Sequence, residues 1–249
     1  MSPIGRLLVA ILLVFGAPLS IGAAREVAKP WPKSWQDADW SSAGLLPAPN
    51  AHKEAHVAVL AARTARWKGL FSQHCWIVIK PKGHARYERY EVVGWGDPVR
   101  KDAYAADGRW FSNQPTVVYE ISGHAAAKII PTLRHAIDTY THNAPETYRM
   151  WPGPNSNTFV ATMARQIVGF DPHLPANAIG KDYLREGTYF GPTPTNSGWQ
   201  VSLGGFLGVT LARREGFEIN LFGLVVGANV SPATLSLPSL GTMRLDGEP

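Results

Sequence analysis

The sequence contains a single cysteine, Cys75, among its 249 residues, so an intramolecular disulfide is excluded. A chain of this size does not need one, because roughly 200 residues can bury a sufficient apolar core. No recognised nucleic-acid motif is present, and no apolar run beyond the N-terminal region is long enough to span a bilayer. We therefore expect a soluble main body and no nucleic-acid partner.

Clusters of metal ligands are also scarce. His52 and His56 have the i, i+4 spacing that places two histidines on one face of a helix. No third ligand lies nearby in the sequence, so we predict no metal site. We also predict no bound cofactor, because no motif for one was found.

The one long apolar run lies at the N-terminus. Arg6 precedes an apolar stretch from Leu7 to Leu19, and the small residues 22–24 follow it. This pattern predicts a secretory signal peptide over residues 1–24, with an uncleaved N-terminal anchor as the alternative. The protein is then exported to the periplasm or cell envelope. Its net charge of +5 suits anionic lipids or wall polymers as neighbours, although a solvated basic surface is the simpler interpretation.

Residues 25–50 are rich in proline and tryptophan. We interpret them as a semi-rigid linker that wraps onto the body, with the tryptophans docking as anchors; tryptophan contact with a membrane interface is the alternative. Length favours a single domain over residues 51–249.

The pattern of residues 51–249 predicts an α+β fold with an antiparallel sheet, two main helices and C-terminal β-hairpins. Strands are expected at 56–60, 74–79, 87–95 and 116–121, helices at about 124–140 and 156–168, a loop at 171–197, and a hairpin formed by 206–213 and 217–226. Pro131 is expected to kink the first helix or delay its start. The turn at 81–84 predicts that His74 lies opposite Val93.

The segment WPGPNSNTF, residues 151–159, places small polar residues at the start of the second helix. Ser156 or Asn155 at this position is either an N-cap or part of a catalytic site. A helix N-terminus carries free N–H groups and partial positive charge, which favour an ionised nucleophile and stabilise an oxyanion. His74, at the start of a strand, is a candidate general base, or a histidine that hydrogen-bonds to the backbone.

Two short motifs resemble the circularly permuted papain-like enzymes of the lecithin:retinol acyltransferase type. The segment from His74 to Val78 is similar to the strand that begins with the base histidine in that family, and the segment from Asn155 to Phe159 is similar to its nucleophile-bearing helix start. The resemblance implies a permuted papain-like fold in which Ser156 replaces the family cysteine. The chain also resembles a bacterial domain family of unknown function that carries the WPGPNSNTF segment.

A serine needs a stronger base and an orienting partner, because its hydroxyl is far less acidic than a thiol. Glu91 is expected to approach His74 only if a bulge shifts the strand register. The orienting group is therefore missing or comes from elsewhere, with His124 or Asp182 as candidates; capping or packing is the structural alternative for His124. Cys75 is expected to point to the opposite face of the strand from His74, as a buried thiol.

Two functions follow as hypotheses. The first is a hydrolase or acyltransferase that acts on an amide or ester of wall peptide or lipid, with Ser156, His74, Asn155 and His124 as site residues. The second is a catalytically inactive binding or structural module, in which the apolar C-terminal strands and the tryptophan-bearing linker dock on envelope partners.

Overall fold

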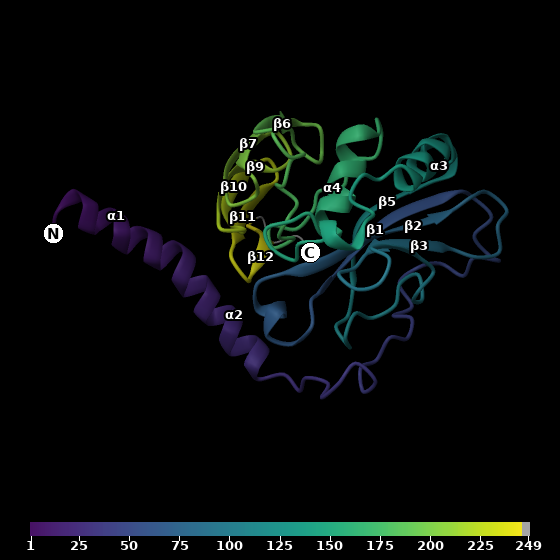
Figure 1. Ribbon diagram of the computed structural model, residues 1–249, viewed down its shortest axis with the longest axis horizontal. Helices are drawn as coiled ribbons and strands as arrows, with labels where there is room; N and C mark the ends of the chain where they lie inside the picture. The colour runs from purple at the N-terminus through teal and green to yellow at the C-terminus, as the bar shows by residue number, and fades with distance from the viewer. Residues whose placement is uncertain (246–249) are drawn as a thin grey trace.

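The computed structural model describes residues 1–245 and has an α+β architecture (Figure 1). It contains one five-stranded antiparallel sheet in the order β4-β3-β2-β1-β5 and one seven-stranded antiparallel sheet in the order β12-β11-β10-β9-β8-β7-β6. A long N-terminal helical arm projects from the body. The predicted α+β class and the C-terminal strands are confirmed.

The five-stranded sheet is built around two buried strands. Its strands are β1 (His56–Arg63), β2 (Gln73–Lys80), β3 (Glu88–Val92), β4 (Val99–Lys101) and β5 (Thr116–Ser122). β1 and β2 are covered on both faces, which explains their nearly continuous apolar sequences. Ile77 pairs with Tyr90, and continuing this register places His74 opposite Val93, as the turn position predicts.

Two helices cover one face of this sheet. α3 (Gly123–Asp138) and α4 (Ser156–Gln166) pack their apolar side chains against β1 and β2, and the short 3-10 helices η2 (Arg66–Leu70) and η3 (Pro145–Thr147) lie in the connections. α3 begins at Gly123 and continues through Pro131, so the late start considered above is wrong. Burial of Ile130 and Leu133 on either side of the proline offsets the hydrogen bond that proline cannot donate.

The other face of the five-stranded sheet is covered by irregular chain. Trp35 and Trp40, from the proline- and tryptophan-rich segment, pack in an aromatic cluster with Trp110. The Trp110 ring belongs to the apolar cluster that includes Trp76 of β2. This cluster encloses the face toward which His74 points.

The seven-stranded sheet is a meander in which each strand pairs with the next. Its strands are β6 (Phe190–Pro192), β7 (Gly198–Leu203), β8 (Leu207–Ala212), β9 (Gly216–Leu221), β10 (Leu224–Val230), β11 (Ala233–Leu237) and β12 (Gly241–Arg244). The predicted strand at 217–226 is in fact two strands. Phe222 and Gly223 both have positive φ and form a tight turn, which the apolar residues on either side, Leu221 and Leu224, did not reveal. β6 likewise lies inside the predicted loop.

The N-terminal arm is one apolar helical segment, composed of α1 (Pro3–Ile11), the π-helix η1 (Leu12–Gly16) and α2 (Ala17–Val27). By length and composition, residues 3–27 are sufficient to cross a membrane. The predicted apolar N-terminal segment is therefore confirmed as a helix, and it is compatible with either a signal peptide or an anchor. The helix extends beyond residue 24 and ends at Val27.

Candidate functional site

His74 lies at the start of β2 in an aromatic enclosure. Its side chain is on the face opposite α3 and α4, and only 4% of the residue is exposed. The imidazole stacks on the Trp110 ring, with ring centroids 3.8 Å apart and an interplanar angle of 12°. Packing therefore fixes the plane of the ring.

Glu91 is the partner that orients His74. Nε2 of His74 lies 2.8 Å from Oε2 of Glu91. Glu91 reaches His74 although the paired residues of β2 and β3, from Ile77–Tyr90 to Ile79–Glu88, show no register shift. Glu91 lies two residues before Val93 and on the same face of the sheet, so it is a diagonal neighbour of His74, within reach of a long side chain. The alternation of side chains along β3 is the sequence signal that could have found this contact, which was not expected without a bulge.

Arg89 balances the buried carboxylate. Its guanidinium donates a hydrogen bond to Oε2 of Glu91 at 2.9 Å and another to the carbonyl of Ala105 at 2.9 Å. The guanidinium also stacks over the Trp76 ring at 4.0 Å from its centroid. His74, Glu91 and Arg89 thus form a connected polar group inside an aromatic shell.

These contacts fix the protonation states of the pair. Burial alone would raise the pKa of Glu91, but the hydrogen bond from His74 and the charge of Arg89 outweigh it and lower that pKa. Burial lowers the pKa of His74 below 6.5, against the opposing influence of Glu91. Glu91 is therefore ionised, and neutral His74 donates Nε2–H to it. Nδ1 of His74 then carries the lone pair, and it has no hydrogen-bond partner within residues 1–245.

Asn155 caps α4. Its Oδ1 accepts hydrogen bonds from the backbone N–H groups of Asn157 and Thr158, at 2.9 and 3.1 Å. Its Nδ2 donates to the carbonyls of Met150 and Ile179, each at 3.0 Å. The side chain is fully engaged in holding the helix start and the adjoining loops.

Ser156 follows the cap as the first residue of α4. Its Oγ makes no hydrogen bond among the described residues, and Ser156 is largely buried, with 5% of its surface exposed. Ser156 and His74 line the same cavity of about 810 Å³. The structure therefore brings together, at one cavity, the two residues that the sequence motifs indicated.

The cavity has aromatic walls and a basic margin. Its lining includes the aromatic residues Trp35, Trp95, Trp110, Phe111 and Tyr148, and the basic residues Arg66 and Lys68. Burial raises the pKa of Tyr148 to about 12, so its hydroxyl remains protonated at neutral pH. An adjoining apolar cavity of about 350 Å³ shares Trp67, Lys68 and Met150 with the first and extends to Phe222 and Leu224.

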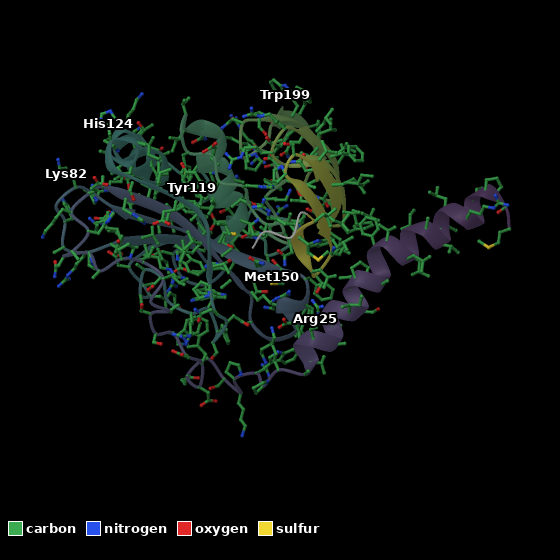
Figure 2. All side chains as sticks on the ribbon, turned by 180° about the vertical axis from the view of Figure 1, so that it is seen from behind. Arg25, Lys82, Tyr119, His124, Met150 and Trp199 are labelled. Carbon is green, nitrogen blue, oxygen red and sulfur yellow. The ribbon has the colours of Figure 1, made fainter. Side chains whose placement is uncertain are left out.

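The two other candidates for the orienting group lie elsewhere. His124 is exposed at the start of α3, on the helix-covered side of the sheet, and Figure 2 shows it far from Met150 at the cavity. Asp182 forms an ion pair with Lys181 at 2.9 Å and accepts a hydrogen bond from Asn220. Neither residue lines the cavity. Both expectations relied on order along the chain, which does not reveal the face of the sheet that each side chain occupies.

Cys75 is fully buried on the helix-covered face, and this burial raises the pKa of its thiol. The opposite orientation of His74 and Cys75 follows from strand alternation. Within residues 1–245, no group of three or more His, Cys, Asp or Glu side chains is arranged to hold a metal ion.

The fold and site define an α+β protein in which a buried His–Glu–Arg group adjoins a helix start at an aromatic cavity. The chain belongs to the DUF3750 family, described as a protein of unknown function, since residues 54–183 match it and make up more than half of the sequence. This confirms the expected membership of a domain family of unknown function. The matched region contains His74, Glu91 and Ser156. Comparisons with curated proteins and with solved structures found no match.

Proposed function

We propose that this protein is a hydrolase or acyltransferase that acts on an amide or ester, with Ser156 as nucleophile, His74 as general base and Glu91 as orienting group. The observation that carries the proposal is the His74–Glu91 hydrogen bond of 2.8 Å, formed at a cavity that Ser156 also lines. The resemblance to permuted papain-like enzymes assigns the same roles to Ser156 and His74. Glu91 supplies the third group that the sequence motifs lacked.

In the proposed reaction, Oγ of Ser156 attacks the substrate carbonyl while Nδ1 of His74 accepts the hydroxyl proton. Glu91 stabilises the imidazolium that forms, and His74 then passes the proton to the leaving amine or alcohol. A water molecule, or an acceptor hydroxyl or amine, attacks the acyl-enzyme and returns Ser156 to its starting form. Because Nε2 is already bound to Glu91, Nδ1 is the nitrogen available for this transfer.

The start of α4 offers a smaller oxyanion site than the sequence indicated. Asn155 occupies the N–H groups of Asn157 and Thr158, which leaves the N–H of Ser156 as the free backbone donor of the first turn. The partial positive charge of the helix N-terminus acts at the same point.

The proposed substrate is a lipid or wall-peptide component of the envelope, and the apolar N-terminal helix is compatible with an exported location. The adjoining apolar cavity, lined by Phe71, Met150, Trp151 and Leu224, favours a substrate with an apolar segment next to the reacting carbonyl. A cavity with these walls also supports a second function, that of a binding module without catalysis. The engagement of two helix-start N–H groups by Asn155 favours this alternative.

The test is covalent labelling of the full-length protein with a fluorophosphonate probe. We expect labelling of the wild-type protein and of His124→Ala, and loss of labelling in Ser156→Ala. His124 is the matched control because it is exposed and distant from the cavity. Equal labelling of the wild-type protein and Ser156→Ala would refute the nucleophile assignment.

A second variant shows whether position 156 is accessible to reagents, and so distinguishes an unreactive Ser156 hydroxyl from an inaccessible one. Ser156→Cys introduces a thiol at the cavity, whereas Cys75 is buried and serves as an internal unreactive control. We expect iodoacetamide to modify position 156 and to leave Cys75 intact in the folded protein. Modification of Ser156→Cys, together with no fluorophosphonate labelling of the wild-type protein, supports the binding module.

A further inference from the structure

The seven-stranded sheet has an apolar outer face. Cross-strand pairing aligns its outward side chains in rows, and we call these residues the outer face: Phe190, Val201, Val209, Ile219, Val226 and Leu237; Trp199, Leu211, Phe217, Leu235 and Met243; and Leu203, Leu207, Leu221 and Leu224. No charged residue belongs to these rows. Trp199 is 57% exposed, Val209 45% and Leu211 69%, so the face is uncovered over β7 and β8, whereas its residues on β10 and β11 are half-buried.

The inner face of the same sheet is polar. The inward positions include Gln200, Thr210, Glu218 and Ser236, all buried against the body. Lys181 reaches this face and forms an ion pair with Glu218 at 2.7 Å. An antiparallel sheet with one solvated face normally has the opposite arrangement, with apolar side chains inward and polar side chains outward. Core packing therefore does not account for the apolar outer face.

The size of this face indicates an interaction surface. Seven strands spaced about 4.8 Å apart, with side chains along about 14 Å of each strand, give an apolar area of about 400 Å². The largest contiguous apolar patch on a typical monomer measures about 300–600 Å² and is often functional, so a patch of this size is a candidate interaction surface. The backbone groups within the sheet are paired between strands, so lipid contact with this face would leave few unpaired polar groups.

The position of the N-terminal helix indicates what the outer face contacts. η1 lies against β10, and Gly22 of α2 packs closely on Ser239 beside β11 and β12. Arg63 fixes this junction, since it contacts Glu26 at 3.2 Å and donates a hydrogen bond to the carbonyl of Ser239 at 2.8 Å. Figures 1 and 2 show the arm projecting from the side of the molecule that the outer face occupies.

We propose that the outer face lies on the surface of the same lipid bilayer into which the N-terminal helix inserts. The helix of residues 3–27 is about 38 Å long at 1.5 Å per residue, enough to cross the apolar core of a bilayer. The aromatic side chains of Trp199 and Phe190 suit the interfacial region. Arg213, exposed in the β8–β9 turn, lies next to the face and suits anionic head groups.

The proposal is tested by measuring the depth of single sites in the full-length protein. A nitroxide spin label is attached to Val209→Cys, and separately to Leu211→Cys, in protein reconstituted into vesicles of phosphatidylethanolamine and phosphatidylglycerol. Lys82→Cys is the control, because Lys82 is exposed and lies at the far end of the molecule from Trp199 (Figure 2). The native Cys75 is buried and does not compete for the label.

We expect the labels at 209 and 211 to collide freely with oxygen, which dissolves in the bilayer. Their accessibility to a water-soluble nickel complex should be about tenfold lower than that of the label at position 82, because the polar complex is excluded from apolar surroundings. Nickel accessibility equal to that at 82 means that the face is in water and overturns the proposal. Shielding from both oxygen and nickel also overturns it, because it indicates coverage by a second copy or another protein. Two independently labelled positions guard against a local effect of one label on folding.

Discussion

The side-chain oxygen of Asn157 accepts a hydrogen bond from the backbone N–H of Cys75 at 3.0 Å. Its Nδ2 donates to the carbonyl of Gln73 at 2.8 Å and to the carbonyl of Ile179 at 2.7 Å. His74 lies between Gln73 and Cys75, so one side chain of α4 holds β2 on both sides of the imidazole. This link fixes the start of β2 beside the helix start that bears Ser156.

Replacing Asn157 with alanine should therefore destabilise the protein. The variant loses three buried hydrogen bonds and leaves the N–H of Cys75 without its partner, so we expect the free energy of unfolding to fall by about 3 kcal/mol. Chemical denaturation followed by tryptophan fluorescence measures this. Asn50→Ala is the control, since Asn50 is exposed and should change stability by less than about 0.5 kcal/mol. Equal stability of both variants would show that the hydrogen bonds of Asn157 contribute little to the free energy of unfolding.

Glu91→Gln tests the orienting role. The amide keeps the shape of the side chain but removes the negative charge that stabilises the imidazolium, so we expect fluorophosphonate labelling of Ser156 to slow by a factor on the order of 10² to 10⁴. Glu88→Gln is the matched control on the same strand, because Glu88 pairs with Lys101 and Arg134 away from the cavity. Circular dichroism confirms that both variants are folded. Similar labelling rates in the two variants would contradict the role of Glu91.

The labelling rate should depend on pH through His74. Burial lowers the pKa of His74 below 6.5, and the base acts in its neutral form. We therefore expect the rate to rise with pH through a midpoint below 6.5 and to be constant at neutral pH. In Glu91→Gln the midpoint should move lower, because the carboxylate that raises this pKa is gone. A midpoint at or above 6.5 in the wild-type protein argues against buried His74 as the base.

Gly94→Ala should disturb the cavity wall. A Cβ at Gly94 would lie 2.5 Å from the Tyr148 ring, so the ring must move. We expect a loss of about 1–3 kcal/mol in unfolding free energy and a changed labelling rate. In Gly191→Ala the added Cβ meets Leu184 at an ordinary 3.5 Å, and stability should change little. Comparing thermal unfolding and labelling of the two variants separates cavity damage from a general cost of losing glycine.

Patterns along the chain located most elements of the five-stranded sheet and its helices. The apolar runs at 56–60 and 74–79 correspond to β1 and β2, and the polar cluster at Asn155 and Ser156 marks the start of α4. The turn at residues 81–84 also agrees with the observed pairing of Ile77 with Tyr90, which places His74 near Val93 when it is continued. These features depend on local side-chain periodicity and turn chemistry, which a single sequence displays directly.

Contacts across the sheet were harder to predict. Glu91 was set aside because it does not stand directly opposite His74, yet a glutamate side chain spans the diagonal. The turn at Phe222 and Gly223 was missed because apolar residues surround it on both sides. Long side chains and positive-φ turns depend on three-dimensional neighbours that sequence order does not specify.

By itself, the sequence determined an apolar N-terminal segment, an α+β class, and a histidine and a serine at the starts of a strand and a helix. Tertiary structure decided that these two residues line one cavity, that Glu91 and Arg89 complete the polar group, and that the C-terminal sheet turns its apolar side outward. The physical reason is that alternation and periodicity are local properties of the chain. Which face of a strand is buried, and against what, depends on packing between segments far apart in sequence.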